Sequence, residues 1–153
     1  MRETDHASLL LIEKVLLLKS LSIFSETPET ILAEVAHLMI DMNTETGEQI
    51  VKEGDIGNCM YIISDGTVNV YKGTHLLMQL QQGDFFGELA LLDTERRSAT
   101  VTAASDCTLF RIDQEPFYDL IESRPEVVRG VIKILCKRIR AINQKLSDAK
   151  GIV

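Results

Sequence analysis

The sequence lacks the residue patterns that several classes of functional site require. Its three cysteines stand far apart and never in a C-x-x-C spacing, which argues against a disulfide framework or a zinc site and indicates a reducing cytoplasm. The three histidines are isolated and have no metal-ligand spacing, and no Ser–His or Cys–His arrangement stands out. Nothing in the sequence therefore indicates an enzyme or a metal site. Tryptophan is absent and aromatic residues make up only 5% of the chain, which predicts an aliphatic core.

The sequence also lacks a membrane span, a cleavable signal peptide and an excess of positive charge. Its longest apolar run, residues 9–18, is interrupted by Glu13 and Lys14 and has about half the length of a transmembrane helix. We therefore expect a cytoplasmic protein with no direct membrane span in this chain. The net charge of −7 disfavours non-specific binding to nucleic acid. The length of 153 residues and the 45% hydrophobic content predict one globular domain over residues 1–153.

Two helices are expected before residue 47. The first covers residues 6–19, with Asp5 as its N-cap, and it is apolar nearly all round. Such a helix is either buried in a small helical core or docks on a neighbouring subunit or domain. The second runs from the cap-and-proline pair Thr27-Pro28 to about residue 42.

Short β-strands are expected over residues 47–112. Apolar runs at strand spacing are separated by turn residues at residues 49–52, 60–64, 67–71, 76–81, 99–103 and 108–112. Asp65-Gly66 between two of these runs predicts a two-residue hairpin. Short strands without intervening helices predict an antiparallel roll or barrel.

Two further helices are expected over residues 114–123 and 126–148, broken at Arg124-Pro125. In the longer helix, apolar residues recur at alternating spacings of four and three: Val128, Ile132, Leu135, Ile139, Ile142 and Leu146. For its first half, a core-facing stripe and a coiled-coil seam are equally compatible with this pattern. Its last two turns favour a seam between the subunits of a homodimer.

Residues 85–101 form the segment with the clearest chemistry. Gly87 allows a sharp turn, and residues 88–92 form a helix so short that it is nearly all terminus. The N–H groups at its start, together with Arg97 further along, are suited to a phosphate group. Glu88 is out of place beside a phosphate unless it accepts hydrogen bonds from another part of the ligand, such as a ribose hydroxyl.

These residues resemble the cyclic-nucleotide-binding domain shared by catabolite-activator-like regulators, cyclic-nucleotide-dependent kinases and cyclic-nucleotide-gated channels. The segment Phe86-Gly87-Glu88-Leu89-Ala90-Leu91-Leu92, followed after four residues by Arg97-Ser98-Ala99-Thr100, is similar to the family's phosphate-binding cassette. Gly47, Gly54-Asp55-x-Gly57 and Gly66 match its roll glycines. The resemblance implies a mainly β fold: an antiparallel β-roll (double-stranded β-helix or jelly roll) over residues 47–112 with its cassette at 86–100. N-terminal helices over 1–46 and C-terminal hinge and lid helices over 113–153 flank this roll.

The resemblance also implies the roles of individual residues. Arg97 binds the cyclic phosphate, Glu88 takes the ribose 2′-hydroxyl, and backbone N–H groups near Gly87 face the phosphate or sugar. The residues implied to bind the ligand are Phe86, Gly87, Glu88, Leu89, Ala90, Arg97, Ser98 and Ala99, with Val70 and Leu77 against the base. Asn143, with Arg138 nearby, lies where family members place a lid, although both could equally be solvated. No aromatic residue follows Tyr118, which excludes an aromatic lid.

By this resemblance the protein is a regulatory sensor for a 3′,5′-cyclic nucleotide that signals through movement of its C-terminal helices. Ser98 after Arg97 favours cyclic AMP over cyclic GMP, because threonine there is commoner in cyclic-GMP binders. The chain stops without a helix-turn-helix domain, so we expect no DNA binding, no cofactor beyond the nucleotide, and a place among other domains of a larger protein. Two alternatives are an oligomerisation scaffold that binds no ligand and a binder of another anionic nucleotide.

Overall fold

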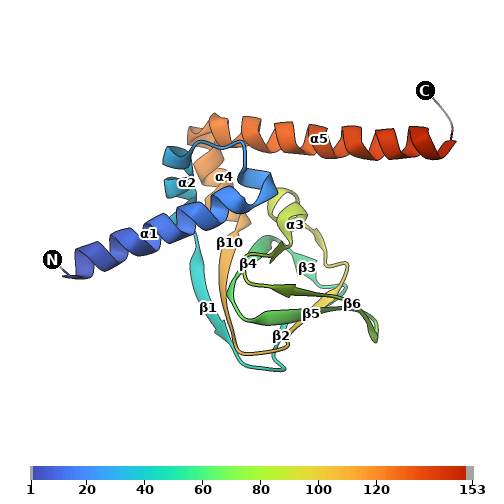
Figure 1. Cartoon of the computed structure of the whole chain (residues 1–153), viewed down its shortest axis with the longest axis horizontal. Coiled ribbons are helices and arrows are strands. Elements are labelled where there is room, and N and C mark those ends of the chain that lie inside the picture. Colours follow the sequence, from blue (N-terminus) through green and yellow to red (C-terminus); the bar gives the residue numbers. More distant parts are fainter. Residues whose placement is uncertain (1, 151–153) are drawn as a thin grey trace. The chain divides into compact units, whose positions relative to one another are not determined.

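The computed structural model describes the backbone of residues 2–150 and the side chains of residues 10–150 (Figure 1). The chain falls into two compact units. A roll unit contains Glu34–Leu120, and a helical unit contains the described residues 2–33 and 121–150. The division of the domain into N-terminal helices, roll and C-terminal helices at residues 46 and 112 stays a prediction. The first strand of the roll begins before that boundary, at Ile40.

The roll unit consists of antiparallel strands in two four-stranded sheets and one two-stranded ribbon (Figure 1). The first sheet has the order β1-β10-β4-β7, the second β2-β9-β5-β6, and the ribbon pairs β3 with β8. The strands are β1 (Ile40–Thr44), β2 (Gln49–Val51), β3 (Ile56–Gly57), β4 (Cys59–Asp65), β5 (Thr67–Lys72), β6 (His75–Gln81), β7 (Phe85–Phe86), β8 (Glu95–Arg96), β9 (Thr100–Ala103) and β10 (Cys107–Asp113). This arrangement confirms the predicted antiparallel β-roll.

The six predicted strands correspond to β2, β4, β5, β6, β9 and β10, but the prediction for residues 37–42 was wrong. The helix expected to reach residue 42 is α2 (Glu29–Ala36), and the chain then enters β1. β1 pairs with β10 along its whole length, from Ile40 opposite Arg111 to Thr44 opposite Cys107. The helical spacing of apolar residues up to Met39 concealed the alternation of Ile40, Met42 and Thr44, which begins directly after it.

Asp65-Gly66 is a turn, but it does not close the hairpin that was expected. β4 belongs to the first sheet and β5 to the second, so the chain changes sheets at this turn. Gly66 has a φ of +97°, and a Cβ here would lie 2.5 Å from the carbonyl oxygen of Asp106. A close approach between two chain segments therefore requires glycine at this turn. The hairpin is the next one along the chain, in which Gly73 and Thr74 join β5 to β6.

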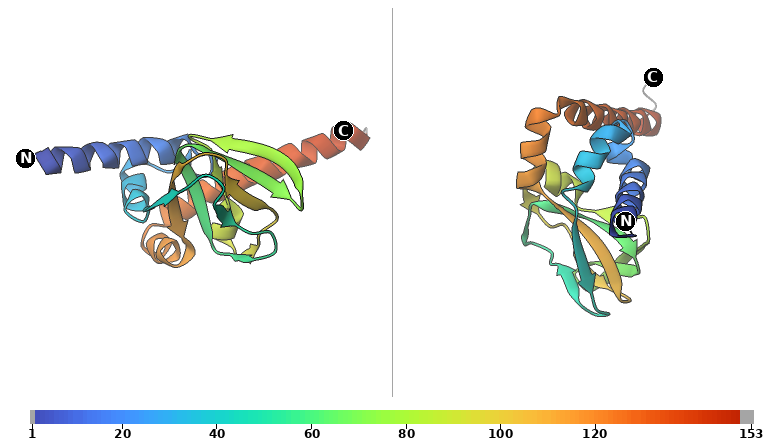
Figure 2. Two further views of the ribbon diagram at one scale, coloured as in Figure 1. Left: turned by 90° about the horizontal axis from the view of Figure 1, so that it is seen from below. Right: turned by 90° about the vertical axis from the view of Figure 1, so that its left-hand side faces the viewer.

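The core of the roll consists of buried side chains from both sheets, whose strands Figure 2 shows from two further directions. Ile63 of β4 and Leu109 of β10 come from one sheet, and Val68 of β5 and Val101 of β9 come from the other. All four side chains are buried, three of them completely. The core is mainly aliphatic, as the scarcity of aromatic residues predicted.

The helical unit contains α1 (Arg2–Ser20), the short helix η1 (Ser22–Phe24) and α5 (Pro125–Lys150). α2 and α4 (Gln114–Ser123) lie across the boundaries between the units along the chain. α1 begins before Asp5, so Asp5 lies inside the helix and not at its N-cap. The hydroxyl of Thr27 is buried and has no hydrogen-bond partner among the described residues, so it does not cap α2 as expected.

The first part of α5 packs inside the helical unit, where Val127, Gly130, Val131 and Ile134 are buried. Lys137 Nζ lies 3.0 Å from Glu26 Oε1, which lowers the pKa of that carboxyl. The expected burial of α1 is incomplete among its described side chains, because Ile12 is 55% exposed and Leu16 62%. Among the described residues, no helix combines the length and apolarity that crossing a membrane would require.

Candidate functional site

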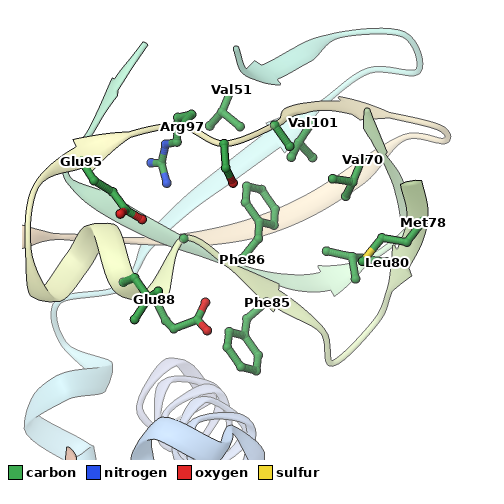
Figure 3. Close-up of a pocket in the computed structure, with 14 residues that line it drawn as sticks. Val51, Val70, Met78, Leu80, Phe85, Phe86, Glu88, Glu95, Arg97 and Val101 are labelled. Atoms are coloured by element: carbon green, nitrogen blue, oxygen red, sulfur yellow. The ribbon is translucent and has the colours of Figure 1, made fainter. Parts of the chain in front are cut away.

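A cavity of about 280 Å³ lies inside the roll unit, next to α3 (Glu88–Leu92) (Figure 3). Both sheets and the segment between β7 and β9 contribute to its wall. The lining residues are Val51, Val70, Met78, Leu80, Phe85, Phe86, Gly87, Glu88, Leu89, Glu95, Arg97, Ser98, Ala99 and Val101. The cavity thus contains the two charged residues, Glu88 and Arg97, that the sequence singled out.

The wall of the cavity has a polar end and an apolar end (Figure 3). The Glu88 carboxylate and the Arg97 guanidinium lie toward one end, with Glu95 beside Arg97. Val70, Met78 and other apolar side chains occupy the opposite end. Such a cavity fits a ligand that has an anionic group and a hydrogen-bond donor at one end and an apolar surface at the other.

The guanidinium of Arg97 is held from behind by β4. Its Nη2 donates to the carbonyl oxygen of Cys59 at 2.9 Å and to the Cys59 sulfur at 3.2 Å. Its Cζ lies 5.9 Å from the ring centroid of Tyr61, which in turn stacks on Phe86 with 5.0 Å between ring centroids. These contacts fix the direction of a long, otherwise flexible side chain before any ligand arrives.

Tyr61 provides a neutral surface under this arginine. The Tyr61 hydroxyl is protonated at physiological pH, and burial moves its pKa further from that range, from 10.0 to about 12. The ring therefore adds no negative charge that would compete with an anionic ligand for Arg97. The Tyr61 ring supports the guanidinium and leaves its positive charge for the cavity.

Two glycines make room for the same guanidinium. A Cβ at Gly57 would overlap Arg97 Nε and lie 2.6 Å from Cζ. A Cβ at Gly87 would lie 2.5 Å from Arg97 Nη1 and 2.8 Å from the carbonyl oxygen of Cys59. Gly87 also has a φ of +83°, which disfavours other residues, whereas Gly57 is not in this left-handed region. At Gly57 the requirement for glycine thus comes from the space that Arg97 occupies.

α3 follows Gly87 directly and is tied at its far end to α4. Gln114 Nε2 donates to the carbonyl oxygens of Ala90 and Leu91 at 3.4 and 3.3 Å. The Tyr118 hydroxyl donates to the carbonyl oxygen of Leu92. The first turns of α4 therefore hold the last carbonyl groups of α3, which a helix cannot satisfy by itself.

Comparison with known proteins agrees with this geometry. Residues 42–124, more than half of the chain, match the Cyclic nucleotide-binding domain family. The chain belongs to this family. It is 31% identical over 132 residues to potassium/sodium hyperpolarization-activated cyclic nucleotide-gated channel 2 of Mus musculus, an alignment that covers 86% of this chain and 15% of the channel.

Two other proteins similar to this cyclic nucleotide-binding domain have names that mention cyclic AMP. The cAMP-dependent protein kinase regulatory subunit of Eremothecium gossypii is 36% identical over 114 residues, covering 74% of this chain and 24% of that protein. The structure of cAMP-bound PfPKA-R has a TM-score of 0.69 at 25% identity, covering 97% of this chain and 50% of that one. The chain thus spans a quarter or less of the curated relatives it matches, and it is a member of a family of regulatory, ligand-binding domains.

The structure gathers most of the predicted ligand-binding residues of this domain around one cavity. Eight of them line it: Val70, Phe86, Gly87, Glu88, Leu89, Arg97, Ser98 and Ala99. The side chain of Ala90 is buried and does not line the cavity, so only its backbone could face a ligand. Asn143 and Arg138 lie on α5 in the helical unit.

Leu77 was expected to lie against the base, but its side chain does not line the cavity and is 47% exposed. The pairing of β5 with β6 shifts between Val70 and Tyr71, so that Val70 lies opposite Met78 and Tyr71 opposite Leu76. Leu77 is left between these two pairs. The apolar residues that β6 contributes to the cavity are Met78 and Leu80.

Sequence reasoning also missed residues that complete the cavity or hold its arginine. Val51, Phe85 and Val101 line the cavity, and Cys59 and Tyr61 hold Arg97 from β4. Strand alternation could have found Val101, which shares a face with Ala99. The contact of Cys59 with Arg97 joins residues 38 positions apart in the sequence, and no local pattern indicates it.

Proposed function

We propose that this domain is a regulatory sensor that binds a 3′,5′-cyclic nucleotide, preferably cyclic AMP, in the roll cavity. The observation that carries the proposal is the joint presence of Arg97 and Glu88 at the polar end of a cavity whose other end is apolar. A scaffold that binds no ligand has no need of a guanidinium and a carboxylate in one cavity. Sequence similarity to a cAMP-dependent regulatory subunit supports the choice of nucleotide.

In this proposal each group has one role. Arg97 pairs with the cyclic phosphate, and Glu88 accepts a hydrogen bond from the ribose 2′-hydroxyl. Ser98 adds a hydroxyl contact, while the N–H groups of Leu89 and Ala90 face the phosphate or sugar. The base lies against Val70 and the apolar side chains of β6. These assignments are those that the resemblance to the family implies, and the placing of Arg97, Glu88 and Val70 around one cavity supports them.

Substitution of Arg97 tests the proposal most directly. Truncating one partner of a charge-assisted arginine–phosphate contact costs about 2–5 kcal/mol. We therefore expect Arg97→Ala to lose measurable binding of cyclic AMP by calorimetry while keeping the circular dichroism of the folded protein. Arg96→Ala is the matched control, because Arg96 donates to the carbonyl oxygen of Gly54 and does not line the cavity. Equal affinities of Arg97→Ala and the parent chain would contradict the assignment.

The identity of the nucleotide can be tested by thermal stability. A ligand at about 100 times its dissociation constant stabilises the native state by about 2.7 kcal/mol. We expect the largest rise in melting temperature with cyclic AMP, a smaller one with cyclic GMP, and none with ATP or dinucleotides. Ser98→Thr should raise the affinity for cyclic GMP relative to cyclic AMP. The absence of a shift with any of these compounds would favour the scaffold function.

We further propose that the ligand acts on the C-terminal helices through α3. The hydrogen bonds from Gln114 and Tyr118 to α3 support this route, because a movement of α3 would alter the first turns of α4. α5 would then act as a lid, with Asn143 or Arg138 over the base. The ligand must bind the two arrangements with different affinity for any such shift to occur. Cyclic AMP should slow hydrogen exchange in residues 114–148, whereas an unchanged profile would contradict coupling.

The setting of the domain is part of the same proposal. The small share of each relative that the chain spans supports a sensor inside a larger cytoplasmic protein. Free thiols at Cys59, Cys107 and Cys136 are consistent with a reducing compartment. The proposed function includes neither catalysis nor DNA binding by this chain.

A further inference from the structure

The second half of α5 presents an apolar stripe that its own unit does not cover. Ile134 is the last buried residue of this helix, and residues 135–150 follow it for about 24 Å without one. The views in Figures 1 and 2 agree that these turns extend past the other helices of their unit. Along the stripe Ile132 is 53% exposed, Ile139 57%, Ile142 57% and Leu146 51%.

The stripe has the spacing of a coiled-coil seam. With Ile132, Ile139 and Leu146 as heptad positions a, the positions d are Val128, Leu135 and Ile142. An apolar stripe of only two residues in seven is as narrow as a coiled-coil seam, which one other helix can bury. The stripe contains no aromatic side chain, whereas helices that lie on a bilayer have a broad apolar face with aromatic residues. These features favour a helical partner over a membrane surface.

The charges beside the stripe identify the kind of helix. The flanking heptad positions e and g are Arg129, Val131, Cys136, Arg138, Asn143, Lys145 and Lys150. Four of these seven residues are basic and none is acidic. Arg138 donates to Ser22 Oγ at 2.7 Å, while Arg129, Lys145 and Lys150 are exposed. The acidic residues of α5, Glu126 and Asp148, lie at positions b and c, away from the seam.

A second copy of the chain does not complement these charges. In a parallel pair, position g of one helix faces position e of the next heptad in its partner, so Lys145 would face Lys150. In an antiparallel pair the flanking rows would also meet without a single carboxylate. Like charges at such positions are unfavourable, and they select against the wrong partner.

We propose that the stripe of α5 docks an amphipathic helix of another protein, with apolar residues along its seam and glutamate or aspartate beside them. The apolar side chains of the two helices interdigitate, and the partner's carboxylates face Arg129, Lys145 and Lys150. This docking extends the role of α5 beyond that of a lid for the nucleotide cavity. Its contacts are distinct from those that line the nucleotide cavity, because no cavity-lining residue belongs to α5.

Two designed peptides of about four heptads test the proposal. Both have leucine and isoleucine at positions a and d, and they differ only in glutamate or lysine at positions e and g. Binding of each labelled peptide to the full chain is followed by fluorescence anisotropy at low and high salt. The glutamate peptide should bind at least about tenfold more tightly than the lysine peptide, and high salt should narrow this difference.

Variants of α5 locate the contact. Ile139→Gln with Ile142→Gln should abolish binding of the glutamate peptide. Lys145→Glu with Lys150→Glu should reverse the preference toward the lysine peptide. Lys133→Glu is the matched control, because Lys133 is an exposed basic residue at position b, away from the seam. This variant should still bind the glutamate peptide more tightly than the lysine peptide. The circular dichroism and the melting temperature of each variant show whether it is folded.

Three results would overturn the proposal. Equal affinity for the two peptides, or no binding of either, would show that the flanking charges select nothing. Sedimentation as a dimer that Ile139→Gln disrupts would assign the stripe to a second copy. Co-sedimentation with phosphatidylserine vesicles, lost in the same variant, would assign it to a membrane. The nucleotide proposal is tested separately, because Arg97→Ala should still bind the glutamate peptide and Ile139→Gln should still bind cyclic AMP.

Discussion

Gly57→Ala offers a direct test of how the cavity holds its arginine. The new Cβ would overlap Nε of Arg97 and lie 2.6 Å from Cζ and 2.8 Å from Cδ, so the whole guanidinium end must move. It would then lose its 2.9 Å hydrogen bond to the carbonyl oxygen of Cys59. We expect a loss of nucleotide affinity of about 2 kcal/mol, roughly thirtyfold, which is the lower end of the range for a displaced arginine–phosphate contact. Calorimetric titration with cyclic AMP measures this loss.

The stability of the ligand-free protein provides the control, because the sign of the effect depends on Arg97. Alanine in place of an unstrained glycine stabilises a protein by about 0.4–1 kcal/mol by restricting the unfolded chain. A displaced arginine should outweigh this gain in the parent chain and lower its stability by about 1 kcal/mol. In an Arg97→Ala background the overlap is absent, and Gly57→Ala should raise the stability. Urea unfolding of the parent chain, Gly57→Ala, Arg97→Ala and the double variant measures the effect of Gly57→Ala on the free energy of unfolding with and without the arginine. The same sign of this effect in both backgrounds would refute the reasoning.

Two further predictions concern stability. The hydroxyls of Thr27 and Thr44 are buried and have no partner among the described residues, so Thr27→Val and Thr44→Val should each raise the free energy of unfolding by about 1 kcal/mol in urea titrations. A loss in either variant would indicate that its hydroxyl is satisfied. The backbone N–H and the hydroxyl of Thr46 donate to Asp106, which lowers the pKa of this carboxyl below its usual 3.8. The stability that the Asp106 carboxylate provides is present above pH 3.8 and is lost as pH falls through the lower pKa of the folded state. Asp106→Asn should therefore make the melting temperature fall less steeply in acid. An unchanged dependence of the melting temperature on acid pH would contradict this.

Local patterns in the sequence predicted the roll strands and the cassette because both depend on neighbouring residues. A continuous apolar run predicted β4, and alternating apolar residues predicted β5 and β9. The segment from Phe86 to Thr100 contains the glycine turn, the short helix and the arginine in one stretch. α4 was predicted with its observed bounds, Gln114–Ser123, because Arg124-Pro125 ends it. In these cases short-range conformational preference and tertiary structure agree.

The sequence could not show features that arise between distant segments. Asp65-Gly66 is a turn in either a hairpin or a change of sheet, and the approach of Asp106 decides between them. The register shift of β5 against β6 decides that Met78, and not Leu77, faces the cavity. β1 is short, follows a helix directly and is stabilised by its pairing with β10, so its own residues gave only a weak pattern.

The glycine pair around Arg97 constrains the order in which related chains can change. A lineage that replaces Arg97 first frees Gly57 to accept a side chain, since that glycine has no other restriction on its backbone. Once a side chain occupies residue 57, restoring the arginine alone would place its guanidinium in occupied space. No single substitution could then restore the arginine in its original position. Relatives that lack this arginine should therefore vary at the residue equivalent to Gly57, whereas relatives that keep it should keep the glycine.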